Sequence, residues 1–256
     1  MAISPDLIIQ AARRPEPAPQ TLPRLLIVGA TGVMGNAVVR RLTGMRRARH
    51  TLVLAKSPIR PGMRDVSAWV VPATESSADF DGWPIPQADI AVVMFDPPRM
   101  FYGREKALWT PRPDQLAKLA LWLRGCGVHT LAIVLPHSQG SLPEALKHGL
   151  ANLDEHRLAT LGIVRLLIVR TAQKPGAASQ THVLKKVAAW MLSVTNYMVP
   201  KSEQPVRAAK VAELVDMALN ILPAGIHVLS PQLVWHAAQG DVEHMRRLLE
   251  QRSAAG

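Results

Sequence analysis

Short apolar runs alternate with amphipathic stretches along most of this 256-residue chain. The run at 24–29 is rich in branched residues and ends in glycine, a pattern typical of a buried parallel strand. The stretch at 114–124 has apolar residues at 116, 119, 120 and 123, the spacing of an amphipathic helix. The same patterns predict further strands at 50–55, 68–71, 89–95, 130–135 and 164–169, and helices at about 33–42 and 144–161.

Strands that alternate with helices through six rounds predict an α/β fold with a doubly wound, parallel, Rossmann-type sheet. After Pro175 the pattern loosens, and we expect a small, mainly helical C-terminal portion. Its predicted elements are helices at 182–194, 208–221 and 241–252 and a strand at 225–229. The expected organisation is a flexible proline-rich arm at 1–23, a dinucleotide-binding domain at 24–175 and a substrate or partner portion at 176–256.

The composition agrees with a folded globular protein, with 48% hydrophobic and 19% charged residues. No apolar run approaches the roughly 20 residues that a transmembrane span needs. Cys126 is the single cysteine, so the chain has no internal disulfide and no cysteine cluster for a metal. The histidines are not spaced as metal ligands either, so no metal is expected. These features favour a reducing compartment, and we expect a cytoplasmic protein.

The chain is basic, with a net charge of +11. Such a charge suits phosphorylated ligands, acidic partner proteins or nucleic acid. The cations are scattered, however, and bunch only at Arg40, Arg41, Arg46, Arg47 and Arg49. Aromatic residues make up only 4%, which argues against platforms for stacking bases. We therefore expect no specific nucleic-acid binding, while a protein partner stays open.

A glycine-rich turn, Gly29-Ala-Thr-Gly32-Val-Met-Gly35, joins the first predicted strand to the first predicted helix. In a dinucleotide site the first glycine allows the sharp turn and the second lets the backbone approach the pyrophosphate. The third lets the helix pack closely on the sheet. The alternative is a tight turn without a ligand. The cofactor-binding residues predicted here are Gly29, Thr31, Gly32, Val33, Met34 and Gly35.

The end of the second predicted strand bears on the choice of cofactor. An NAD site commonly has an acidic residue there, about 20 residues past the glycine turn, to bind the ribose 2′-hydroxyl. The stretch 54–60 contains no carboxylate, whereas Lys56 and Arg60, helped by Ser57, suit a 2′-phosphate. NADP(H) is therefore favoured over NAD(H), although both cations could simply be solvated.

Taken together, the glycine turn, the strand at 88–93, the passage at 123–134 and the passage at 154–170 resemble the atypical short-chain dehydrogenase/reductases. That group includes NmrA-like regulators and relatives of nucleotide-sugar epimerases, and the resemblance extends over about 24–171. It implies a Rossmann fold and a nicotinamide cofactor. In active members it also implies a serine after the fifth strand and a Tyr-x-x-x-Lys pair on the following helix, which together handle the proton.

The catalytic residues depart from the pattern that this resemblance implies. Ser138 fits the serine, but Lys147 stands where the tyrosine belongs and Ala151 where the lysine belongs. A Tyr-x-x-x-Lys spacing does occur at Tyr102 and Lys106, although it follows the fourth strand. The candidate catalytic residues are therefore Ser138, Tyr102 and Lys147.

Two functions compete on this basis. The first is an NADP(H)-binding protein with little or no catalysis, such as a redox sensor, an assembly factor or a structural subunit. The second is an NADP(H)-dependent reductase of a small carbonyl-type substrate with an unusual proton donor. The missing tyrosine and lysine favour the first.

Overall fold

The computed structural model describes residues 22–59, 62–72, 80, 82–99, 101–135, 162–171 and 206–254. The predicted helices at 144–161 and 182–194 lie outside these residues, as does nearly all of the predicted arm at 1–23. The predicted domain boundary at residue 175 also falls in a part of the chain that is not described.

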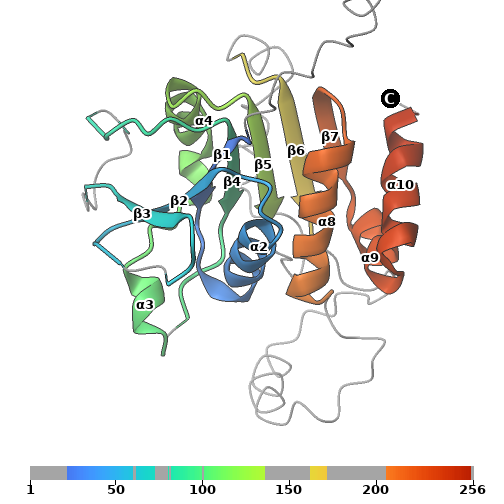
Figure 1. Ribbon diagram of the computed structural model, residues 1–256, viewed down its shortest axis with the longest axis horizontal. Helices are drawn as coiled ribbons and strands as arrows, with labels where there is room; N and C mark the ends of the chain where they lie inside the picture. The colour runs from blue at the N-terminus through green and yellow to red at the C-terminus, as the bar shows by residue number, and fades with distance from the viewer. Residues whose placement is uncertain are drawn as a thin grey trace, which may run out of the picture.

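Seven parallel strands form one sheet in the order β3-β2-β1-β4-β5-β6-β7 (Figure 1). The chain moves outward from β1 to β3 and then returns to β4 beside β1, so the direction of winding reverses between β1 and β4. This topology confirms the predicted doubly wound α/β fold. The strands are β1 (Arg24–Val28), β2 (His50–Ala55), β3 (Val66–Val70), β4 (Ile90–Met94), β5 (Thr130–Leu135), β6 (Arg165–Arg170) and β7 (Gly225–Leu229).

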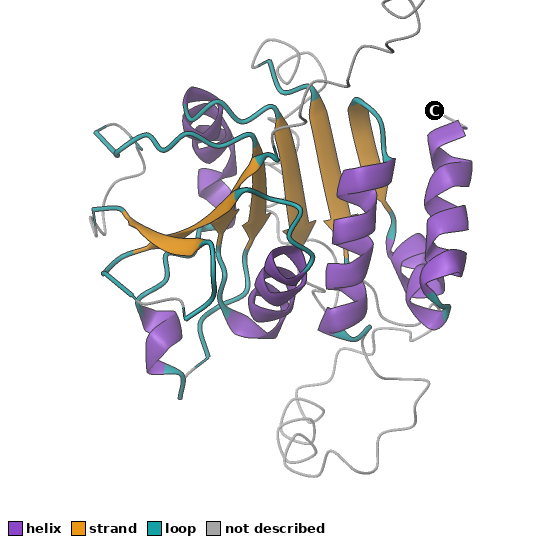
Figure 2. Ribbon diagram, in the orientation of Figure 1, coloured by secondary structure: helices purple, strands orange, loops and turns teal. Residues whose placement is uncertain are grey.

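Helices cover both faces of the sheet. Figure 2 shows α2 and α8 in front of the strands and α4 behind them. None of the helices in the described residues is long and apolar enough to cross a bilayer. The helices are α2 (Gly32–Gly44), α3 (Gly103–Lys106), α4 (Leu116–Gly125), α8 (Ala208–Ile221), α9 (Pro231–Gln239) and α10 (Val242–Ala254), with a short 3-10 turn at Pro113–Gln115.

The core consists of two apolar layers, one on each face of the sheet. Successive residues of a strand point to opposite faces. In β1, Leu25 accordingly packs in the layer with α2, α8, α9 and α10, whereas Leu26 packs in the layer with α4. Nearly continuous apolar strands such as β5, all six of whose residues are buried, are what a sheet covered on both faces requires.

The face behind the sheet contains a cluster of aromatic rings formed by Phe80, Trp83, Trp109 and Trp122. The Trp83 and Trp109 rings meet edge to face with their centroids 5.1 Å apart. Trp122 belongs to α4, and Trp109 belongs to the segment that crosses the ends of β1 and β2. The cluster therefore fixes that segment against the sheet.

An ion-pair network joins α2 to α8 across the front of the sheet. The carboxylate of Asp216 is fully buried and contacts Arg41 and Arg47, each at 3.1 Å. The two arginines therefore balance the negative charge of Asp216, and a buried charge needs such a partner.

The described C-terminal residues share the core of the sheet. β7 pairs in parallel with β6, and buried residues of α8, α9 and α10 belong to the same apolar layer as those of α2. The predicted bounds of β2, β5, β7 and α8 agree with the structure, and β3 begins two residues earlier than predicted. Helix α9 was not predicted, although Ser230 caps it through the Leu233 N–H at 3.3 Å and Pro231 begins it.

Candidate functional site

The glycine turn lies at the carboxyl end of β1, where the winding of the sheet reverses. Ligands of open α/β sheets bind in the crevice beyond the carboxyl ends of the strands at such a point. The first turn of α2 faces this edge together with the segment that follows β4. The glycine turn therefore lies where open α/β sheets bind their ligands.

The glycines of the turn are required by its backbone. Gly29 and Gly32 have φ angles of 73° and 71°, in the left-handed region that favours glycine. A Cβ on Gly29 would lie 2.0 Å from the Met94 carbonyl oxygen, so β1 and β4 could not keep their present spacing there. A Cβ on Gly35 would lie 2.5 Å from the carbonyl carbon of Ala30. Side chains at Gly29 and Gly35 would therefore collide with the backbone of β4 and of the turn itself.

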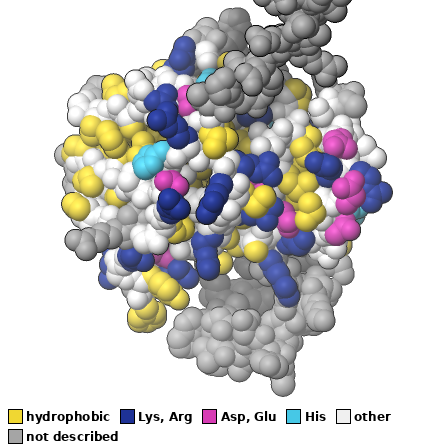
Figure 3. Space-filling view, in the orientation of Figure 1, with side chains coloured by type: hydrophobic (Ala, Val, Ile, Leu, Met, Phe, Trp, Pro, Cys, Tyr) yellow, Lys and Arg dark blue, Asp and Glu magenta, His cyan; other side chains and the backbone are white. Residues whose placement is uncertain are grey.

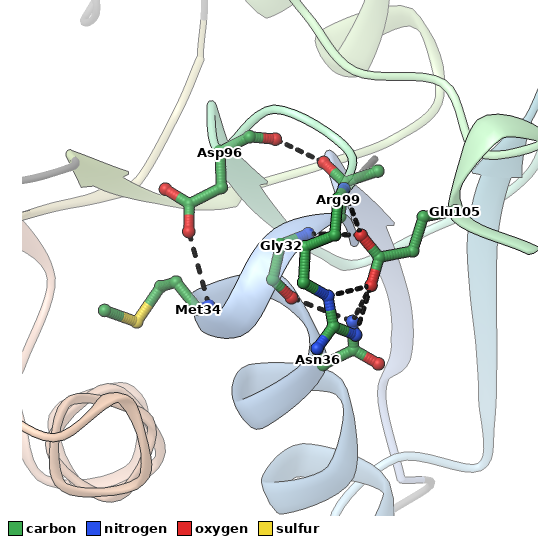
Figure 4. A network of polar contacts seen from close by, with 7 residues as sticks. Gly32, Met34, Asn36, Asp96, Arg99 and Glu105 are labelled. Atoms are coloured by element: carbon green, nitrogen blue, oxygen red, sulfur yellow. Dashed lines mark hydrogen bonds and ion pairs between the residues drawn. The ribbon is translucent and has the colours of Figure 1, made fainter. Parts of the chain in front are cut away.

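The N–H groups of this turn are engaged by carboxylates of the chain itself. Glu105 on α3 accepts the Gly32 N–H at 3.0 Å through Oε2, and Asn36 donates its amide to Oε1 at 2.8 Å (Figure 4). Arg99 donates its backbone N–H at 2.9 Å and its Nε at 2.7 Å to the same carboxylate. The Glu105 side chain is only 5% exposed. A carboxylate therefore occupies the helix N-terminus, which favours anions.

These contacts determine the charge of Glu105. Burial alone would raise the pKa of this carboxyl, but the hydrogen bonds from Arg99 and from the Gly32 N–H, together with the nearby Arg99 charge, outweigh it and lower the pKa below its usual value. Glu105 is consequently ionised at neutral pH, as an anion at this position should be.

A second carboxylate, Asp96, follows β4 directly and reaches the same turn. Its Oδ2 accepts the Met34 N–H at 3.3 Å (Figure 4). The Asp96 side chain also packs directly against Gly32, because a Cβ added to Gly32 would lie only 2.7 Å from the Cβ of Asp96. Burial raises the pKa of Asp96, and the Met34 hydrogen bond offsets this only in part. The charged form of Asp96 is thus less stabilised by its surroundings than the charged form of Glu105.

The segment at 107–111 covers the carboxyl ends of β1 and β2. The Trp109 carbonyl accepts the Gly29 N–H at 3.2 Å, and the Trp109 N–H donates to the Leu54 carbonyl at 3.1 Å. The Ala107 carbonyl accepts the Lys56 N–H at 2.7 Å. Thr31 is fully buried, and its hydroxyl lies 3.0 Å from that of Thr110. The glycine turn is therefore enclosed from the β2 side by the chain that follows α3.

The other predicted site residues are distributed as follows. Val33 is 62% exposed, and Lys56 is exposed at the end of β2, with no ion pair to any described residue. Tyr102 is 53% exposed, with the Arg99 guanidinium carbon 3.6 Å from its ring centroid. Arg60, Ser138, Lys147 and Ala151 lie outside the described residues.

Sequence reasoning did not identify Asp96, Arg99 or Glu105 as site residues. Asp96-Pro97-Pro98 was interpreted only as the end of a strand. A usable signal was present, because a polar residue directly after the fourth strand must lie beside the turn that follows the first. Glu105 gave no comparable signal, since its position depends on the path of an irregular segment.

The fold and the turn define a Rossmann-type α/β protein. No family model matches the sequence, and no curated protein matches it either. Among solved structures, the chain is similar to the yeast methylglyoxal/isovaleraldehyde reductase Gre2 complexed with NADPH, at 12% identity over 81% of this chain and 75% of that one, with a TM-score of 0.49. It is also similar to a nucleoside-diphosphate-sugar epimerase from Staphylococcus aureus, at 15% identity over 80% and 70% of the two chains, with a TM-score of 0.45.

A third similar structure is MoeE5 in complex with UDP-glucuronic acid and NAD, at 13% identity over 80% of this chain and 75% of that one, with a TM-score of 0.44. Other similar structures are an NAD(P)-binding Rossmann-fold protein and a short-chain dehydrogenase/reductase.

Proposed function

We propose that this protein binds a nicotinamide dinucleotide at the glycine turn without ordinary short-chain-dehydrogenase turnover. The observation that carries the proposal is the turn itself, with left-handed φ angles at Gly29 and Gly32 at the reversal between β1 and β4. The residues that would hold the pyrophosphate are Gly29, Thr31, Gly32, Val33, Met34 and Gly35.

Binding in this mode requires the Glu105 carboxylate to leave the Gly32 N–H, because one N–H cannot donate fully to two anions. Glu105 thus competes with the pyrophosphate, and the apparent affinity falls with the fraction of molecules in which it is displaced. Displacement would also release Arg99, which now pairs with Glu105 and is 32% exposed beside the turn. A free guanidinium there could pair with a phosphate.

Such competition suits a sensor better than an enzyme, because ligand binding would be coupled to a change in the segment at 99–106. The role of redox sensor, assembly factor or structural subunit is part of this proposal, as is a protein partner that reads the change. The cytoplasmic location expected from the single cysteine remains a prediction.

NADP(H) is the proposed form of the cofactor. Lys56 is an exposed cation at the end of β2, and the described residues at 54–59 contain no carboxylate to bind a ribose 2′-hydroxyl. Arg60 is proposed as the second cation for the 2′-phosphate.

The second candidate function is an NADP(H)-dependent reductase with an unusual proton donor. The observation that favours it is the position of Tyr102, which is half exposed next to the network at the glycine turn and whose carbonyl accepts the Glu105 N–H at 2.9 Å. Ser138 and Lys147 are the other proposed donors.

Calorimetric titration with NADPH and NADH tests the binding proposal. We expect saturable NADPH binding by the wild type that is weaker than binding by Glu105→Ala, by about tenfold or more, because a charge-assisted hydrogen bond contributes about 1.5–3 kcal/mol. Glu250→Ala is the matched control, since Glu250 is a carboxylate in an exposed pair with Arg246 on α10. Equal affinity in the wild type and Glu105→Ala would exclude competition by Glu105. If no variant binds either dinucleotide, the proposed function is wrong.

Turnover is tested separately with NADPH and a panel of carbonyl and quinone substrates. Binding without oxidation of NADPH supports the non-catalytic proposal. Oxidation that disappears in Tyr102→Phe while NADPH affinity is retained would establish the reductase instead.

A further inference from the structure

A second concave site lies at the amino ends of the strands, on the opposite end of the sheet from the glycine turn. It is a cavity of about 670 Å³ between the C-terminal end of α2, the start of β2 and the residues before β3. This volume is within the range of small-molecule sites, roughly 300–1,000 Å³. Its position at the amino ends of the strands separates it from the dinucleotide site proposed above.

The wall of this cavity is strongly cationic. Arg40, Arg46, Arg49 and Arg64 line it, and Asp65 is the single carboxylate among its lining residues. None of the four arginines forms an ion pair with any part of the chain that the structure describes. Figure 3 shows Lys and Arg side chains gathered over the middle of the face that α2 covers. The cavity therefore presents an excess of uncompensated positive charge.

The bunched arginines of the sequence divide into two sets in the structure. Arg41 and Arg47 turn toward the buried Asp216 and hold α2 to α8. Arg40, Arg46 and Arg49 line the cavity instead, and the fold brings Arg64 to them from another segment. The first set has a structural partner within the protein, and the second set does not.

The helix dipole does not account for this second set. The negative end of a helix attracts cations within its last turn. Helix α2 ends at Gly44, so Arg46, Arg49 and Arg64 lie beyond it. Arg46 directly follows the C-cap residue of α2 and has a φ of 49°, the left-handed conformation in which helices commonly end.

Backbone hydrogen bonds hold the walls of the cavity in place. The Arg49 N–H donates to the Pro23 carbonyl at 3.0 Å, and the Thr51 N–H donates to the Asp65 carbonyl at 2.8 Å. The Arg46 N–H donates to the Thr43 carbonyl at 3.2 Å. Because these contacts fix the segments that bear the arginines, a ligand would not have to order them on binding.

Apolar side chains complete the lining of the cavity. Leu22, Leu42, Ala48 and Met63 contribute to it, and Leu42 is buried. A cationic wall with an apolar lining fits a compact ligand that has both anionic groups and a less polar body. Guanidinium groups pair with phosphate oxygens in bidentate geometry, which makes a phosphorylated ligand the best match.

We propose that this cavity binds a small ligand carrying two or more phosphate charges, of the size of a nucleoside diphosphate. Inorganic pyrophosphate and ADP are the probes, and the titration is calorimetric at constant ionic strength. The variant is Arg49→Gln/Arg64→Gln. The control is Arg247→Gln/Arg252→Gln, which removes the same charge from exposed positions on α10.

We expect both probes to bind the wild type and the control with equal affinity, and the variant about tenfold or more weakly, since each tenfold corresponds to about 1.4 kcal/mol. Equal weakening in variant and control would indicate a general charge effect and overturn the proposal. Affinity that rises in Glu105→Ala and is indifferent to Arg49→Gln/Arg64→Gln would locate binding at the glycine turn and also overturn it. The proposal would also be overturned if neither probe showed saturable binding, or if only an oligonucleotide bound.

Discussion

Glu105 accepts the Gly32 N–H at 3.0 Å, although the two residues are 73 positions apart in the chain. The glycine turn is built to place N–H groups toward an anion, and in this structure that anion is a carboxylate of the protein. The left-handed backbone at Gly29 and Gly32 is compatible with either occupant. Whether a pyrophosphate can bind at the turn therefore depends on how strongly Glu105 holds the Gly32 N–H compared with a pyrophosphate.

The two end regions of α2 allow a matched test of the packing at the turn. A Cβ at Gly35 would lie 2.5 Å from the carbonyl carbon of Ala30 and 2.9 Å from the Gly29 oxygen, and both are backbone atoms. We expect Gly35→Ala to lower the free energy of unfolding by about 1–3 kcal/mol. Gly44→Ala meets no atom within 4 Å and should leave it unchanged or raise it by up to about 1 kcal/mol. Urea denaturation of both variants measures this, and similar values for the two would refute the steric interpretation.

The buried carboxylate of Asp216 should need at least one of its two arginine partners for the protein to be stable. Its carboxylate is fully buried, whereas the Arg41 and Arg47 side chains are 29% and 41% exposed. Arg47→Ala leaves Arg41 in place and should cost less than about 1 kcal/mol. Replacing both arginines leaves a buried charge without a cation and should cost about 3–5 kcal/mol. Thermal and urea unfolding would contradict this if the double replacement cost no more than the single one.

Much of the fold could be predicted because its signals are local. A strand buried on both faces must be apolar along its length, so β5 could be delimited at both ends from the sequence. The turn at 29–35 was recognisable because the backbone itself requires glycine there. The short apolar strand and the periodic helix that flank it gave the order of elements.

The network around the turn could not be predicted in the same way. Helix α3 is only four residues long and has no periodic pattern, so nothing local indicates where Glu105 lies. The segment at 107–111, which follows α3 directly, pairs with the ends of β1 and β2 and so keeps α3 near Gly32. That pairing depends on Trp109 packing among rings from other segments, a contact that spacing along the chain does not reveal.

Cys126 should be inert in the folded protein. It is 3% exposed, and burial raises the pKa of its thiol to about 12. Since the thiolate is the reactive species, we expect a disulfide reagent to modify the native protein far more slowly than the urea-unfolded protein at mildly alkaline pH. Modification of the native protein at the unfolded rate would show that Cys126 is accessible.

The two acids at the glycine turn should give opposite dependences of stability on pH. The pKa of Glu105 is lowered from an ordinary value of 4.5, so its stabilising contribution is complete above that value and is lost as pH falls through the lowered pKa. Glu105→Gln should therefore be less stable than the wild type at neutral pH, with a difference that shrinks in acid. Urea unfolding across this pH range measures the difference, and a constant gap would contradict the assignment.

Asp96→Asn should behave in the opposite way. Burial raises the pKa of Asp96 above an ordinary value of 3.8, so the folded protein binds the proton more tightly than the unfolded chain. Stability consequently falls as pH rises from that ordinary value through the raised pKa, and the deficit persists at neutral pH. Asparagine keeps an oxygen that can accept the Met34 N–H but carries no charge, so this variant should be more stable than the wild type at neutral pH. The gain should disappear in acid below the ordinary value, and a variant less stable at neutral pH would mean that the ionised Asp96 stabilises the turn.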